Sequence, residues 1–141
     1  MPPKTKLKKS KVLKALKVRD LIAYFYIAEM LDKSVMKIVE DLKLTDYIEV
    51  RYDKGLDYYY IINIENYYGV TIDYKNAKVR PFMSGLYYGD YYRSQEDIQF
   101  DTNTPLEEVF EKAIEKDELN KELYDMIKTV CQALAAEAVS M

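Results

Sequence analysis

Apolar residues between positions 11 and 44 recur at intervals of three and four, the spacing that places them on one face of an α-helix. Three polar residues at 32–34 interrupt this stripe and offer side chains that can cap a helix end. The pattern therefore predicts two helices, over about 11–32 and 34–44. Their apolar stripe consists of Leu21, Tyr24, Phe25, Ala28, Leu31, Val35, Ile38, Val39 and Leu42.

From residue 47 the spacing changes to alternation with a period of two, which is typical of β-strands. In the first strand, Ile48 and Val50 alternate with Glu49 and Arg51. Short turns follow at intervals, so neighbouring strands are expected to pair antiparallel as hairpins. The four strands are expected at about 47–52, 57–65, 70–74 and 77–82.

Glycine and proline mark the ends of these strands. Gly55, in the turn Asp53-Lys54-Gly55, is expected to adopt a positive φ, which glycine does at no steric cost. Pro81 has no amide hydrogen, which favours a sheet edge or the end of the fourth strand. After it, we expect a short fifth strand or an ordered loop within 83–93.

A second helical region begins at residues 104–107, TPLE, with threonine at the N-cap, proline at the first helical position and glutamate three residues after the cap. A break is expected at 116–117. The predicted fold class is α+β: an antiparallel sheet of four or five strands over about 47–92, packed on one face by the N-terminal and C-terminal helices. Residues 1–10 are expected to be a flexible basic arm and residues 11–141 a single domain.

Tyrosine is concentrated in the predicted sheet, since only Tyr24, Tyr26 and Tyr124 of the 15 tyrosines lie outside it. Tyrosine favours strands, and its ring often lies with one end in apolar surroundings and its hydroxyl in water. We therefore expect the sheet face turned away from the helices to be amphipathic and exposed. Tyrosine and arginine are enriched at interface centres, so this face is predicted to bind protein. The predicted contact residues are Tyr47, Arg51, Tyr59, Ile61, Arg80 and Phe82 on the outer face, with Tyr87, Tyr91 and Arg93 in the loop that follows.

Charge is distributed unevenly, although the net charge is only −3. Residues 1–19 contain eight Lys or Arg and no acid, whereas residues 94–141 contain four bases and twelve acids. The chain is therefore a basic arm on an acidic body. The acidic C-terminal helices are expected to face solvent or a basic partner.

Catalysis has little support in this composition. The chain has no histidine, the usual general base, and its single cysteine, Cys131, can form neither a zinc site nor an internal disulfide. The spacing of Asp73, Asp90, Asp97 and Asp101 matches no metal-binding motif. We therefore predict no enzyme activity, no cofactor, no metal and no membrane span, and a reducing, cytoplasmic location.

A nucleic-acid alternative rests on residues 34–64, where a helical segment, SVMKIVEDLKL, precedes two strands joined by a short turn. This order resembles the recognition helix and wing of a winged-helix domain, with Lys54 at the wing tip. The resemblance implies DNA binding, which the basic arm would strengthen through phosphate contacts. Glu40 and Asp41 depart from it, because acids in a recognition helix repel phosphates. The basic residues of this alternative are Lys4, Lys6, Lys8, Lys9, Lys11, Lys14 and Lys54.

The predicted function is non-catalytic macromolecular binding, with a protein partner or self-association ahead of nucleic acid. The predicted surfaces are the outer sheet face, rich in tyrosine and arginine, and the acidic C-terminal helices. By analogy, a small accessory, inhibitor or assembly protein, such as those of mobile elements, has these features.

Overall fold

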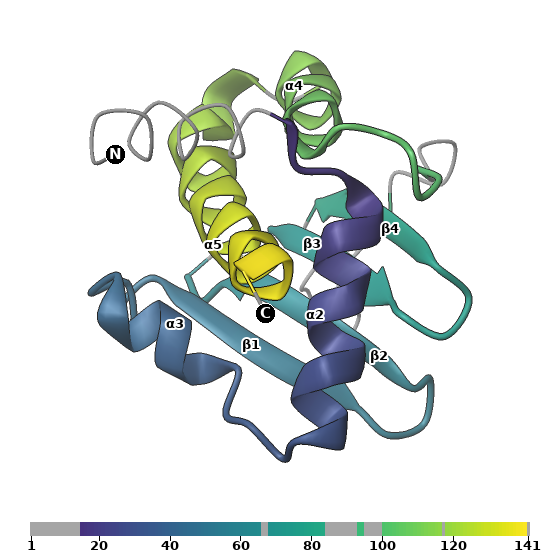
Figure 1. Cartoon of the computed structure of the whole chain (residues 1–141). Helices are drawn as coiled ribbons and strands as arrows, with labels where there is room; N and C mark the ends of the chain where they lie inside the picture. The colour runs from purple at the N-terminus through teal and green to yellow at the C-terminus, as the bar shows by residue number, and fades with distance from the viewer. Residues whose placement is uncertain (1–14, 66–67, 84–92, 95–99, 117, 141) are drawn as a thin grey trace, which may run out of the picture.

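Five antiparallel strands form one sheet in the order β1-β2-β3-β4-β5, and helices cover one face of it (Figure 1). The predicted α+β class, with helices before and after the sheet, is confirmed. The fifth strand contains two residues. The computed structural model describes residues 15–65, 68–83, 93–94, 100–116 and 118–140.

The helical segments follow the predicted stripes but are shorter. Leu31 and Leu42 lie just after the last residues of the two N-terminal helices and are exposed, so the predicted apolar stripe extends one residue too far in each. Among the described residues, the helices are α2 (Val18–Met30), α3 (Met36–Asp41), α4 (Leu106–Lys116), the 3-10 helix η1 (Glu118–Asn120) and α5 (Lys121–Ser140).

The first turns of α2 and α4 are joined by backbone hydrogen bonds. Val18 N donates to Thr104 O at 2.9 Å, and Leu106 N donates to Leu16 O at 2.9 Å. The carbonyl of Pro105 accepts the first helical bonds of α4, so the helix begins one residue later than predicted. The Thr104 hydroxyl donates to the carboxylate of Asp101 at 3.1 Å, a contact formed within the preceding turn.

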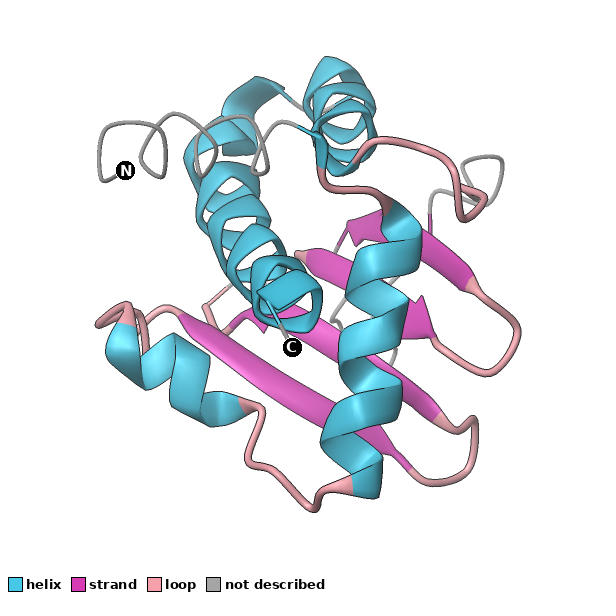
Figure 2. Cartoon of the chain, in the orientation of Figure 1, coloured by secondary structure: helices cyan, strands magenta, loops and turns pink. Residues whose placement is uncertain are grey.

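The helices lie on one face of the sheet (Figure 2), and the main hydrophobic core lies between these two layers. Helices α2 and α5 pack on each other across the front of the sheet, and α4 lies near β4. Burying such apolar surface is the dominant favourable contribution to folding. Its largest fully buried members include Phe25, Ile61, Ile72, Tyr74, Phe110, Tyr124 and Ile127.

The strand pairing fixes which side chains share a face, because residues paired across antiparallel strands point the same way. Val50 pairs with Ile61, and Ile61 pairs with Val70. All three lie on the helix side, where Ile61 and Val70 have no exposed surface. The strands are β1 (Ile48–Asp53), β2 (Tyr58–Asn63), β3 (Gly69–Asp73), β4 (Lys78–Met83) and β5 (Arg93–Ser94).

Two residues predicted for the outer face, Tyr59 and Ile61, lie on the helix side instead. The ring of Tyr59 packs against Phe25 of α2, with ring centroids 4.5 Å apart. The alternation in β2 was predicted correctly, but its orientation was wrong. Side chains on both faces of this strand are apolar, so the spacing alone does not show which set faces the helices. Tyr59 and Ile61 therefore pack in the core.

The β1–β2 and β3–β4 loops are built alike, each around an aspartate that ends the preceding strand. Asp53 Oδ1 accepts hydrogen bonds from the backbone amides of Gly55 at 2.8 Å and Leu56 at 3.0 Å. Asp73 Oδ1 accepts one from the Asn76 amide at 3.1 Å. Such bonds from aspartate to nearby amides stabilise tight turns.

The left-handed backbone conformation falls at the last residue of each of these loops. Asp57 has a φ of 60° and Ala77 a φ of 57°. Gly55 does not have a positive φ, so that prediction was wrong. The loop spans residues 54–57, and its left-handed position is its last residue, Asp57, two positions after Gly55.

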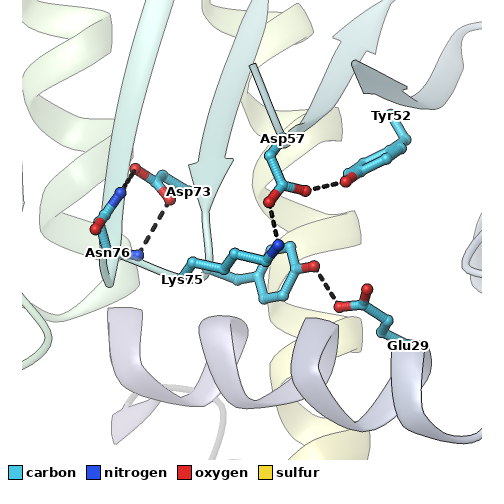
Figure 3. Close-up of polar contacts among 7 residues, drawn as sticks. Glu29, Tyr52, Asp57, Asp73, Lys75 and Asn76 are labelled. Atoms are coloured by element: carbon cyan, nitrogen blue, oxygen red, sulfur yellow. Dashed lines mark hydrogen bonds and ion pairs between the residues drawn. The ribbon is translucent and has the colours of Figure 1, made fainter. Parts of the chain in front are cut away.

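A polar network joins these two loops to α2 (Figure 3). The Tyr74 hydroxyl donates to the carboxylate of Glu29 in α2. Asp57 accepts a hydrogen bond from the Tyr52 hydroxyl and forms an ion pair with Lys75. The network therefore fixes both loops relative to α2.

Stability at alkaline pH is expected to depend on Tyr74. Burial of the Tyr74 phenol raises its pKa above the ordinary value of 10.0. The hydrogen bond to Glu29 and the charge of Glu29 are smaller causes that act in the same direction. Above about pH 10 the unfolded chain therefore loses a proton that the folded chain keeps, and the unfolding free energy falls as the pH rises. Denaturant unfolding at several alkaline pH values measures this slope.

In Tyr74→Phe the alkaline slope should be smaller but not absent, because burial also raises the pKa of Tyr24, Tyr59 and Cys131. Below about pH 9 the difference in unfolding free energy between Tyr74→Phe and the parent protein should not change with pH. An unchanged slope above pH 10 would contradict the assignment.

Strand β1 is an edge of the sheet, and α3 lies beside it (Figure 1). The backbone amide of Val50 donates to the sulfur of Met36 in α3, at 3.3 Å from N to Sδ. A side chain of α3 therefore covers part of an edge that would otherwise present unpaired amides to solvent.

Candidate functional site

The outer face of the sheet, which is turned away from the helices, carries three rows of side chains that run across the strands. The row nearest the β1–β2 and β3–β4 loops is polar, the middle row is mixed and the third is largely apolar. In order from these loops, the rows are Asp53, Tyr58, Asp73 and Lys78; Arg51, Tyr60, Thr71 and Arg80; and Glu49, Ile62, Gly69 and Phe82.

The apolar part of this face is buried. Tyr60, Ile62 and Phe82 form a second hydrophobic cluster, separate from the main core, and Tyr58 packs against it. The rings of Tyr60 and Phe82 meet edge to face with centroids 6.0 Å apart. Phe82 is only 1% exposed, so the expectation that it forms part of an exposed contact surface was wrong.

A pocket of about 140 Å³ opens between the first two rows, near the β3–β4 loop. Its walls come from strands β2, β3 and β4 and from the loop between the last two. All of its lining residues except Asn76 belong to the two rows described above. They are Tyr58, Thr71, Asp73, Asn76, Lys78 and Arg80.

One of the polar groups that line this pocket, the Thr71 hydroxyl, is buried. Thr71 is 3% exposed, and its Oγ1 is buried without a hydrogen-bond partner in the part of the chain that the structure describes. A buried hydroxyl without a partner destabilises a fold, typically by about 1–3 kcal/mol. Such a group in a pocket wall marks a place where a ligand can supply the missing partner.

Two cations flank this hydroxyl. Arg80 pairs directly with Thr71 across the strands, and Lys78 pairs with Asp73. Neither cation forms an ion pair with any residue in the described ranges. Within these ranges, no ion pair therefore neutralises the charge of Lys78 or Arg80.

The carboxylate of Asp73 is held in place by Asn76 (Figure 3). Asp73 Oδ1 accepts from the Asn76 backbone amide, and Asp73 Oδ2 accepts from the Asn76 side-chain amide at 2.9 Å. With one aspartate against a lysine and an arginine, the pocket walls carry a net charge of +1. An anionic group is the ligand that this arrangement favours.

The structure brings few of the predicted contact residues together. Arg80 lines the pocket, Arg51 lies in the same row but forms an ion pair with Glu49 at 3.0 Å, and Tyr47 is exposed just before β1. Arg93 belongs to β5. Tyr87 and Tyr91 lie outside the described residues.

The residues of the nucleic-acid alternative are only partly described. Lys54 is exposed in the β1–β2 loop, whereas Lys4, Lys6, Lys8, Lys9, Lys11 and Lys14 lie outside the described residues. The helix–strand–strand order of residues 34–64 is present as α3, β1 and β2. However, β2 continues into a five-stranded sheet rather than forming a projecting wing.

Sequence reasoning missed four residues of the pocket: Tyr58, Thr71, Asn76 and Lys78. The available signal was Thr71, a polar residue between the apolar Val70 and Ile72. Asp73 was considered only as a metal ligand, and no group of metal-binding side chains is found within the described residues.

Burial raises the pKa of the Cys131 thiol well above its ordinary value, so this cysteine stays protonated at neutral pH. No helix in the described ranges is suited to crossing a bilayer. The chain matches no protein-family model, no curated protein and no solved structure.

Proposed function

We propose that the protein is a non-catalytic binding domain that associates with a protein partner through the outer face of its sheet. The pocket beside Thr71 carries this proposal. It combines a buried hydroxyl that lacks a partner with Lys78 and Arg80, whose charges are not neutralised by ion pairs within the described residues. These groups are suited to binding an anion, and the one carboxylate among the residues that line the pocket, Asp73, is held by Asn76.

Charge favours a protein partner over nucleic acid. Residues 20–141 contain 13 Lys or Arg and 24 Asp or Glu, a net charge of −11. The outer face itself balances Arg51, Lys78 and Arg80 with Glu49, Asp53 and Asp73. A polyanion needs an extended basic surface along its backbone. The outer face instead offers one local cationic pocket.

Selection from a library of random displayed peptides on the immobilised full-length protein tests the proposal. Peptides with an acidic residue are expected to be enriched and to shift backbone NMR resonances of β3 and β4. Arg80→Glu should weaken their binding about tenfold or more, because a charged hydrogen bond is replaced by repulsion. Lys54→Glu is the matched control, since it makes the same charge change on the exposed β1–β2 loop.

The proposal would be wrong if the selected peptides shifted only resonances of the helices, or if Arg80→Glu and Lys54→Glu weakened binding equally. A gel-shift assay with single- and double-stranded nucleic acid tests the alternative. Tight binding at physiological salt, unaffected by Arg80→Glu, would favour nucleic acid and the basic arm.

A further inference from the structure

We propose that the outer-face pocket seats one phosphate group, carried by a phosphorylated side chain of the protein partner. The Thr71 hydroxyl, Lys78 and Arg80 are the groups that would hold it. This inference rests on the proposed function and adds the chemical identity of the group that is bound.

The strand register places the three groups side by side. Thr71 and Arg80 are directly paired, as are Asp73 and Lys78 in the next row. Directly paired residues have Cβ atoms about 4.5–5.5 Å apart. The long side chains of Lys78 and Arg80 can therefore converge on a group that also contacts Thr71. The pocket volume of about 140 Å³ is several times the roughly 30 Å³ of a water molecule, so a phosphate group has room.

The number and kind of these groups favour phosphate over carboxylate. A phosphate monoester presents three acceptor oxygens and a charge of about −1.5 to −2 at neutral pH. The guanidinium of Arg80 can bind two oxygens at once, the ammonium of Lys78 acts as a point charge, and the Thr71 hydroxyl donates one hydrogen bond. A planar carboxylate has only two oxygens and less negative charge, so it matches these three groups less well.

The charge of Asp73 opposes phosphate binding, so its removal is expected to raise the affinity for phosphate. Its carboxylate lies in the pocket wall and is 6% exposed, so its charge reduces the attraction of an anion. Asp73→Asn removes that charge while it leaves an oxygen to accept from the Asn76 amide. This variant should bind phosphate more tightly than the parent protein does.

The surroundings of the pocket favour a single phosphate. Asp53 lies in the row that ends with Lys78, and Glu49 is paired with Arg51. A nucleic acid backbone passing over the pocket would bring neighbouring phosphates close to these acids. A phosphorylated side chain presents one phosphate and no such neighbours.

Titration of the full-length protein with phenyl phosphate, followed by backbone NMR, tests the inference. Saturable shifts are expected at Thr71, Asp73, Lys78 and Arg80. Lys78→Gln and Arg80→Gln should each weaken binding about tenfold. Lys54→Gln removes the same charge as Lys78→Gln from an exposed loop, and its affinity should stay within about twofold of the parent value.

Thr71→Val separates binding from folding. Valine has nearly the same shape as threonine but removes the buried hydroxyl, so the thermal midpoint should rise by about 3 °C. The affinity for phenyl phosphate should fall at least threefold because one hydrogen bond is lost. A lower thermal midpoint, or an unchanged affinity for phenyl phosphate, would show that the Thr71 hydroxyl is not an unpaired group that binds the ligand.

Parallel titrations with glutamate and with a single-stranded oligonucleotide distinguish the sources of the anion. Glutamate binding as tightly as phenyl phosphate would overturn the choice of phosphate and leave the proposed function intact. Tighter oligonucleotide binding with the same dependence on Arg80 would overturn the choice of a protein side chain. If no anion binds but selected peptides still shift β3 and β4, only this inference fails; if neither binds, the proposed function fails as well.

Discussion

Replacing Gly69 with alanine is expected to destabilise the protein by about 3 kcal/mol or more. A Cβ at this position would lie 2.1 Å from the carbonyl oxygen of Ile61 and 2.9 Å from the Cα of Ile62. Both neighbours are backbone atoms of β2, so relief requires β2 and β3 to separate locally. A change from glycine to alanine also lowers the conformational entropy of the unfolded chain, which stabilises a protein by only about 0.4–1 kcal/mol. This gain is too small to offset the clash.

Denaturant unfolding of Gly69→Ala and Gly55→Ala measures the difference between the two glycines. A Cβ on Gly55 would meet only the Asp53 side chain at 3.3 Å, and Gly55 has no positive φ. Gly55→Ala should therefore stay within about 1 kcal/mol of the parent protein. Equal effects at the two positions would contradict the close approach of β2 and β3.

Ile61→Ala should destabilise the protein by about 3 kcal/mol, within the range usual for truncating a buried isoleucine. Ile61 has no exposed surface and lies on the helix side of β2, between Val50 and Val70. Removing three carbons there loses apolar burial and leaves a cavity. Binding through the outer face should be unaffected once the variant is folded.

Ile64→Ala is the matched control for this prediction. Ile64 lies just beyond β2 and is 36% exposed, so its truncation should change the unfolding free energy by less than about 1 kcal/mol. Urea unfolding of both variants gives the comparison. A small loss for Ile61→Ala together with weakened peptide binding would return Ile61 to the outer face, as the sequence alone had indicated.

The elements of this fold follow from the sequence because periods of two and of three to four residues are distinct. Alternation alone does not orient a strand when both of its faces are apolar, and this explains the error at β2. In β3, by contrast, Val70 and Ile72 alternate with the polar Thr71, and the apolar pair lies on the side of the helices.

The candidate site was less predictable than the fold. The pocket depends on the pairing of β3 with β4, which sets Thr71 opposite Arg80 and Asp73 opposite Lys78. Residues nine and five positions apart in the chain become neighbours only through this register. Arg80 alone was predicted as a contact residue, because arginine is common at interfaces whatever lies beside it.

The contact between Val50 and Met36 bears on behaviour at high protein concentration. An open edge strand is a template on which another chain can add a strand, and repetition of that step produces fibres. Here the amide in the middle of β1 already donates to a sulfur of the neighbouring helix. Oxidation converts such a thioether into a bulkier, polar sulfoxide, which would disturb this contact and uncover the edge of β1. Oxidation of Met36 is therefore expected to favour ordered aggregation at high protein concentration.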